Sequence, residues 1–103
     1  PQDWLVLLEA VKRMFLRFAD EPPIMEAELR QVRTPVLALG ALEDPIVPAG
    51  EVRTLASRLP RATAALFPGT AHPIARAPLD TIVTTLARFH ADPDRMIRVA
   101  RVN

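Results

Sequence analysis

The chain has no cysteine, which excludes disulfide bonds, a thiolate nucleophile and a metal site with cysteine ligands. Its only serine is Ser57. No apolar run approaches the roughly 20 residues of a membrane-spanning helix, and the N-terminus lacks the charged and apolar regions of a secretory signal. The sequence therefore predicts no membrane span, and a cytoplasmic location is the default expectation.

The sequence also lacks the features that several other classes of function require. The 13 basic residues are scattered rather than gathered in a run, and the net charge is only +1, so no nucleic-acid partner is expected. Neither apolar strand-like segment leads into a glycine-rich phosphate loop, which disfavours nucleotide binding. The two histidines, His72 and His90, have no ligand-spaced partner, so neither a metal nor another cofactor is expected.

Half of the 103 residues are hydrophobic, as in a globular chain of one domain at most. Two apolar runs have the length of strands, VLALG after Pro35 and ATAALF over Ala62–Phe67, and both are interpreted as strands buried on their two faces. Between them, the segment EVRTLASRLP has the apolar spacing of a helix that ends at Pro60. Strand, crossover helix and strand predict a right-handed βαβ unit with parallel strands.

Helices are predicted on both sides of this unit. Apolar residues recur at steps of three and four from Asp3 to Ala19, which indicates an amphipathic helix. A short helix is expected over Met25–Val32. A third helix is predicted from Pro78 to His90, with Leu79, Ile82, Val83, Leu86 and Phe89 on one face. For the tail after His90 the sequence gives no structural prediction.

Two candidate functional residues follow the predicted strands. Parallel strands end at the same edge of a sheet, where open α/β folds bind ligands, and Asp44 and His72 lie a few residues beyond the two strand ends. A carboxylate that accepts from one ring nitrogen leaves the other nitrogen free to act as a base. Glu43 is interpreted as solvated and is the weaker candidate for the acid. His90 is interpreted as structural, at a helix end where an imidazole interacts favourably with the last carbonyls.

The segment from Thr34 to His90 resembles the C-terminal part of α/β-hydrolase fold enzymes. The matching features are a strand that ends at Gly40, the acidic turn with Asp44, the stretch PIVP over 45–48, and GTAH ending in His72. The resemblance implies a C-terminal βαβα portion of that fold over 35–90, preceded by cap-type or connecting helices over 1–34 and followed by a tail over 91–103.

The resemblance also implies a function. Asp44 and His72 would be the acid and base of a Ser-His-Asp mechanism, with carboxylic esters as the first substrate class to test. The family's nucleophile motif, GxSxG, is absent, and Ser57 lies in the predicted crossover helix, where it does not fit that role. The chain alone is therefore expected to be inactive, and its expected partner is a missing N-terminal portion or a second copy.

A different class of function stays open. The chain could be a non-catalytic α/β interaction module, because Asp-Pro is a common turn opener and loop histidines are common. In that case Asp44 and His72 are inherited or incidental residues. Ester hydrolysis assays on the chain, alone and with a candidate N-terminal half, separate the two hypotheses.

Overall fold

A computed structural model describes residues 3–102. At its centre, strands β1 (Val36–Ala41) and β2 (Ala62–Phe67) form a parallel two-stranded sheet and are joined by helix α3 (Ala49–Arg58). The first residues of the two strands are paired, as are the last, so the strands end level. The predicted mixed α/β class and parallel βαβ unit are thus confirmed.

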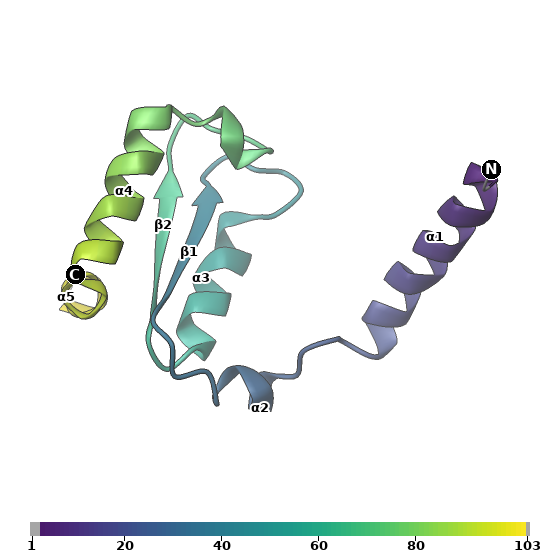
Figure 1. Ribbon diagram of the computed structural model, residues 1–103, viewed down its shortest axis with the longest axis horizontal. Coiled ribbons are helices and arrows are strands. Elements are labelled where there is room, and N and C mark those ends of the chain that lie inside the picture. The colour runs from purple at the N-terminus through teal and green to yellow at the C-terminus, as the bar shows by residue number, and fades with distance from the viewer. Residues whose placement is uncertain (1–2, 103) are drawn as a thin grey trace.

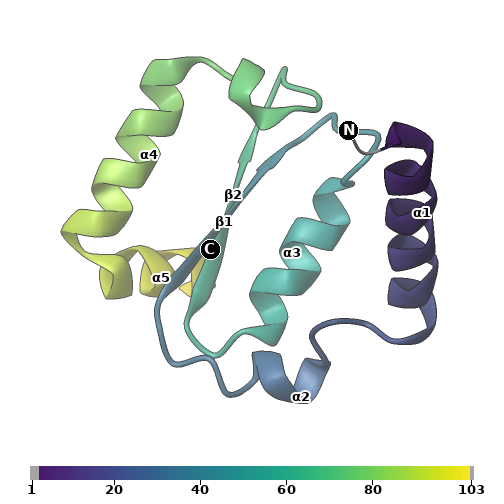
Figure 2. The ribbon, with the colours of Figure 1, turned by 45° about the vertical axis from the view of Figure 1, so that its right-hand side comes forward.

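Helices cover both sides of the sheet. Helix α3 lies on one side of the strands and α4 on the other, while α5 contacts β2 (Figure 1, Figure 2). Helix α5 lies entirely in the part of the chain after His90, for which the sequence gave no structural prediction. The remaining helical elements are α1 (Trp4–Asp20), α2 (Glu26–Leu29), the short 3-10 helix η1 (Ile74–Arg76), α4 (Leu79–Ala91) and α5 (Pro93–Val102).

The core is small and lies between the sheet and its flanking helices. It includes Val52 of α3, Leu59 directly after α3, Phe67 of β2, Phe89 of α4 and Ile97 of α5. These five side chains come from or directly follow four different elements, and they come from both sides of the sheet. The α/β unit is therefore held together by a few contacts of high individual importance.

One sequence-based expectation about burial is wrong. The strands were expected to be fully buried, but Leu37 and Leu66 are only half-buried, because a two-stranded sheet leaves the outer edge of each strand uncovered. The apolar face that the sequence predicts for α4 is only partly covered. Phe89 is buried, whereas Leu79 and Val83 remain exposed.

Helix α1 stands apart from the α/β unit (Figure 1). Asp3 caps it by accepting the backbone N–H of Leu5 at 2.9 Å, and the predicted helix is confirmed. None of the residues Trp4–Asp20 is buried, and Phe15 on its apolar face is 64% exposed. The radius of gyration is 16.6 Å, against about 13 Å for a compact chain of this length. The apolar face of α1 is therefore available to another surface.

The close packing of β1 against α3 depends on Gly40. A Cβ at this position would lie 2.8 Å from Leu66 Cδ2 and 2.8 Å from Val52 Cγ2, and a valine in a helix has little rotamer freedom to move away. Gly40→Ala is expected to lower the free energy of unfolding by about 1–3 kcal/mol. Urea titration followed by circular dichroism measures this change.

Gly50→Ala is the matched control for Gly40→Ala. Gly50 lies in the first turn of α3, and no atom would come within 4 Å of a Cβ there. The substitution is expected to raise the free energy of unfolding by up to about 1 kcal/mol, because it restricts the unfolded chain. Effects of the same sign at both glycines would contradict the close approach at Gly40.

Candidate functional site

The two loops that leave the C-terminal ends of the strands lie side by side. The loop after β1 carries Asp44 and the loop after β2 carries His72. Asp44 Oδ2 lies 3.0 Å from His72 Nδ1, although the two residues are 28 positions apart in the sequence. The predicted meeting of the carboxylate and the imidazole at one edge of the sheet is confirmed. Their catalytic role stays a prediction.

The carboxylate of Asp44 is held on both of its oxygens. Oδ1 accepts the backbone N–H groups of Ile46 at 2.8 Å and Val47 at 3.0 Å, so the turn after Asp44 folds around its own side chain. Oδ2 is left for the ring of His72. Only 6% of the Asp44 side chain is exposed to solvent, so the group is both fixed and shielded.

The turn that delivers His72 is encoded by Pro68-Gly69. Gly69 has a φ of 66°, in the left-handed region that the third position of a type II turn requires, and proline is common at the position before it. This local geometry turns the chain back toward β1 directly after β2. It places His72 opposite Asp44 rather than in open solvent.

The ring of His72 is oriented for proton transfer. An ionised Asp44 accepts a hydrogen bond, so Nδ1 carries the proton and Nε2 keeps its lone pair. The side chain is 43% exposed, and Nε2 makes no hydrogen bond to any residue between 3 and 102. The accessible nitrogen can therefore act as a general base towards a group that approaches this edge.

The surroundings of Asp44 lower the pKa of its carboxyl below the ordinary value of 3.8. Burial raises this pKa, but the backbone donors Val47 and Ile46 and the ring of His72 together outweigh it by stabilising the charged form. Because the pKa is lower in the folded state, ionised Asp44 stabilises the fold at pH values above 3.8. That contribution is lost as the pH falls through the lowered folded pKa.

The free energy of unfolding is expected to differ between the wild-type chain and Asp44→Asn at neutral pH. The difference is expected to become smaller in acid, because acid protonates the wild-type carboxyl. Urea unfolding at neutral pH and in acid measures the difference. A ¹³C NMR titration of the Asp44 carboxyl gives an independent test, and a midpoint at or above 3.8 would contradict the prediction.

The side-chain contact of Glu43 differs from what the sequence predicts. The residue is exposed overall, as expected, but its carboxylate is not simply solvated: Oε2 accepts the backbone N–H of Thr70 at 3.0 Å. The backbone N–H of Glu43 also donates to the carbonyl oxygen of Thr70 at 3.2 Å. Sequence reasoning missed this contact because it depends on which residues of two irregular loops come to lie opposite each other.

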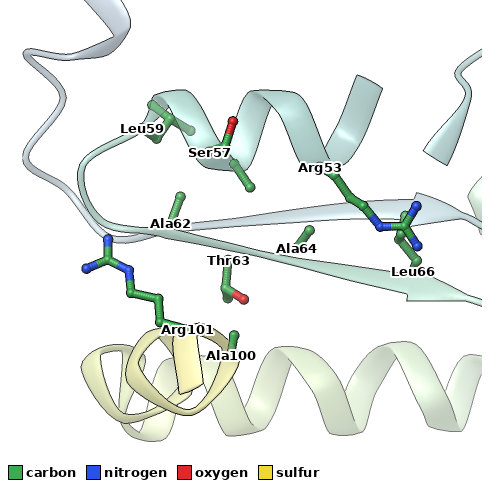
Figure 3. A pocket seen from close by; sticks show the side chains of 10 residues that line it. Arg53, Ser57, Leu59, Ala62, Thr63, Ala64, Leu66, Ala100 and Arg101 are labelled. Atoms are coloured by element: carbon green, nitrogen blue, oxygen red, sulfur yellow. The ribbon is translucent and has the colours of Figure 1, made fainter. Parts of the chain in front are cut away.

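Ser57 is not brought to the Asp44–His72 pair. Helix α3 runs from the C-terminal edge of the strands back to their start, and Ser57 lies in its last turns, where its hydroxyl donates to the carbonyl of Thr54 at 2.7 Å. It borders an open pocket of about 500 Å³ beside β2 (Figure 3). Neither Asp44 nor His72 lines that pocket, so its size does not mark it as the place of this chemistry.

His90 lies in the last turn of α4, as the sequence predicts, and is exposed. Its ring packs edge-on against that of Phe89, with 5.8 Å between the ring centroids. It is separate from the Asp44–His72 pair, so its interpretation as a structural residue is retained.

Three further findings bear on the class of protein. Within residues 3–102, histidine and acidic side chains do not gather in the groups of three that could hold a metal ion. No helix in this part of the chain combines the length and apolar character needed to cross a bilayer. No model of a known protein family matches the chain. Fold and site together define a mixed α/β chain with a carboxylate–imidazole pair at the C-terminal edge of parallel strands.

Proposed function

We propose that this chain supplies the acid and the base of a Ser-His-Asp ester hydrolase, as the C-terminal portion of an α/β-hydrolase fold. The observation that carries the proposal is the 3.0 Å contact between Asp44 Oδ2 and His72 Nδ1 at the C-terminal edge of two parallel strands. The resemblance over Thr34 to His90 supports it. The low exposure of Asp44 and the free Nε2 of His72 are the properties that the two roles need.

In the proposed reaction, His72 Nε2 removes the proton from a serine hydroxyl as its oxygen attacks the ester carbonyl carbon. Asp44 stabilises the imidazolium that forms. The imidazolium then gives the proton to the leaving alkoxide while the carbonyl carbon–alkoxide bond breaks, which leaves the acyl group on the serine. Water, activated by His72, releases the acid in the second half of the reaction.

The serine must come from outside the part of the chain that the structure describes, because Ser57 is not at the site. Two surfaces suit the docking of a nucleophile-bearing portion. The outer edge of β1 can pair with a further strand, and the apolar face of α1 is exposed. We propose the preceding portion of the same hydrolase fold as the occupant, since it would supply both a strand and an apolar surface.

The test is p-nitrophenyl acetate hydrolysis in three samples: the chain alone, the polypeptide encoded directly upstream of Pro1 alone, and the two together. Only the combined sample is expected to turn over the ester. Activity of the combined sample that survives His72→Ala, or no activity above that of the separate samples, would contradict the proposal. The choice among esters, thioesters and other acyl substrates depends on the nucleophile loop and the cap.

A non-catalytic interaction module is the second candidate function. The exposed apolar face of α1 favours it, because that face suits a partner protein whether or not chemistry takes place. This candidate predicts that the upstream polypeptide binds the chain in gel filtration and that the complex has no esterase activity.

A further inference from the structure

We propose that Glu43 is a positioning residue, which holds the loop of His72 against the loop of Asp44. Glu43 directly precedes Asp44, and its contact Thr70 lies two residues before His72. The inferred effect on catalysis rests on the proposed function. The effect on the Asp44–His72 contact does not, because it concerns this chain alone.

The two loops are joined in three successive steps beyond the paired strands. First, the N–H of Leu42 donates to the carbonyl of Phe67 at 2.9 Å and extends the strand pairing by one bond. Glu43 and Thr70 then exchange two hydrogen bonds, one through the backbone of Glu43 and one through its carboxylate. Asp44 and His72 form the third step.

Of the two hydrogen bonds between Glu43 and Thr70, the one through the carboxylate is the one that depends on the Glu43 side chain. Thr70 is only 5% exposed, so its N–H has little access to water and depends on a protein acceptor. Glu43 Oε2 supplies one at 3.0 Å, and a charged acceptor makes a stronger hydrogen bond than a neutral one. Removing it leaves a shielded donor unsatisfied, and the loop can relieve that cost by moving.

A displacement of Thr70 also displaces His72, because the two residues are only two positions apart in the same loop. The Asp44–His72 contact tolerates little displacement, because its two atoms are already 3.0 Å apart and hydrogen bonds weaken steeply as they lengthen and bend. Asp44 cannot follow the ring, since its other oxygen is held by the N–H groups of Ile46 and Val47. The position of the ring is thus set by the Glu43–Thr70 connection.

The experiment uses the full chain with ¹⁵N-labelled histidine and three variants: Glu43→Ala, Glu43→Gln and the control Glu51→Ala. Gln keeps an oxygen that can accept from Thr70. Glu51 is an exposed carboxylate in the first turn of α3, away from the connection. The readouts are the downfield ¹H NMR resonance of a His72 Nδ1–H bonded to a carboxylate and the hydrogen-exchange rate of the Thr70 amide.

In Glu43→Ala the Nδ1–H resonance is expected to broaden or disappear, and the Thr70 amide is expected to exchange roughly ten-fold faster or more, the factor that one charge-assisted hydrogen bond represents. Glu43→Gln should retain most of both signals, and Glu51→Ala all of them. A sharp resonance and a protected amide in Glu43→Ala would overturn the proposal. So would their absence from the wild-type chain, or equal losses in Glu43→Gln and Glu43→Ala.

The assembled hydrolase provides a second, separable readout. There, Glu43→Ala should lower kcat with little change in KM, and Glu43→Gln should restore much of the rate, because the proposed role of this side chain is to position His72 and not to bind substrate. If the wild-type assembly is inactive while the NMR effects are present, the proposed function fails and the positioning role stands. If the assembly is active and Glu43→Ala leaves both kcat and the NMR signals unchanged, the positioning role fails alone.

Discussion

Replacing His72 by alanine is expected to lower the kcat of the proposed ester hydrolase assembly by about three to four powers of ten. Among residues 3–102, His72 is the histidine whose ring contacts a carboxylate, at 3.0 Å from Asp44, and its removal takes the base away from the proposed proton transfer. Burst and steady-state kinetics with p-nitrophenyl acetate measure the loss.

Asp44→Asn tests the role of the carboxylate in the Asp44–His72 pair. The amide can still accept from Ile46 and Val47 through one oxygen, but its NH₂ group faces the ring and favours the wrong tautomer. A loss of up to about four powers of ten is expected. His90→Ala is the matched control, since it removes an exposed imidazole at the end of α4 and should leave kcat unchanged. Equal losses for His72→Ala and His90→Ala would exclude a specific role for either ring.

Phe67→Ala is expected to cost about 3–5 kcal/mol of folding free energy, the usual loss for a buried phenylalanine. Phe67 is the last residue of β2 and only 5% exposed. A small domain has about 5–15 kcal/mol in total, so the variant should be largely unfolded at temperatures where the wild-type chain is folded. Thermal unfolding monitored by circular dichroism gives the comparison.

Phe15→Ala removes the same side chain from α1, where it is 64% exposed, and provides the control. Its effect on unfolding of the chain alone is expected to stay within about 0.5 kcal/mol. If the apolar face of α1 docks on a partner, Phe15→Ala should instead weaken the assembly with the upstream polypeptide, as measured by titration calorimetry. Equal destabilisation by Phe67→Ala and Phe15→Ala would contradict the burial pattern.

The sequence was sufficient to predict the parts that depend on local pattern. Two apolar runs around an amphipathic segment led to the parallel βαβ unit, and the strand ends led to the meeting of Asp44 and His72. The Pro68-Gly69 turn is encoded in two residues. Each of these features follows from periodicity, from a conformational preference of proline or glycine, or from the rule that parallel strands end at one edge.

The features that the sequence did not reveal depend on tertiary placement. The acceptor role of Glu43 arises only once Thr70 lies opposite it, and no spacing rule pairs the residues of two loops. The half-burial of Leu66 follows from the small number of strands in the sheet, and the exposure of Leu79 shows that no described element covers the start of α4. Hydrophobic periodicity shows which face could be buried, whereas the surface that covers it must be found in three dimensions.

The level ends of β1 and β2 have a consequence for assembly. The βαβ unit by itself fixes the distance between Asp44 and His72. Two of the three groups of the proposed triad are therefore already positioned relative to each other before another polypeptide binds. In the proposed assembly, an incoming segment has only its serine hydroxyl to align with this pair. Such pre-organisation reduces the entropy lost on docking.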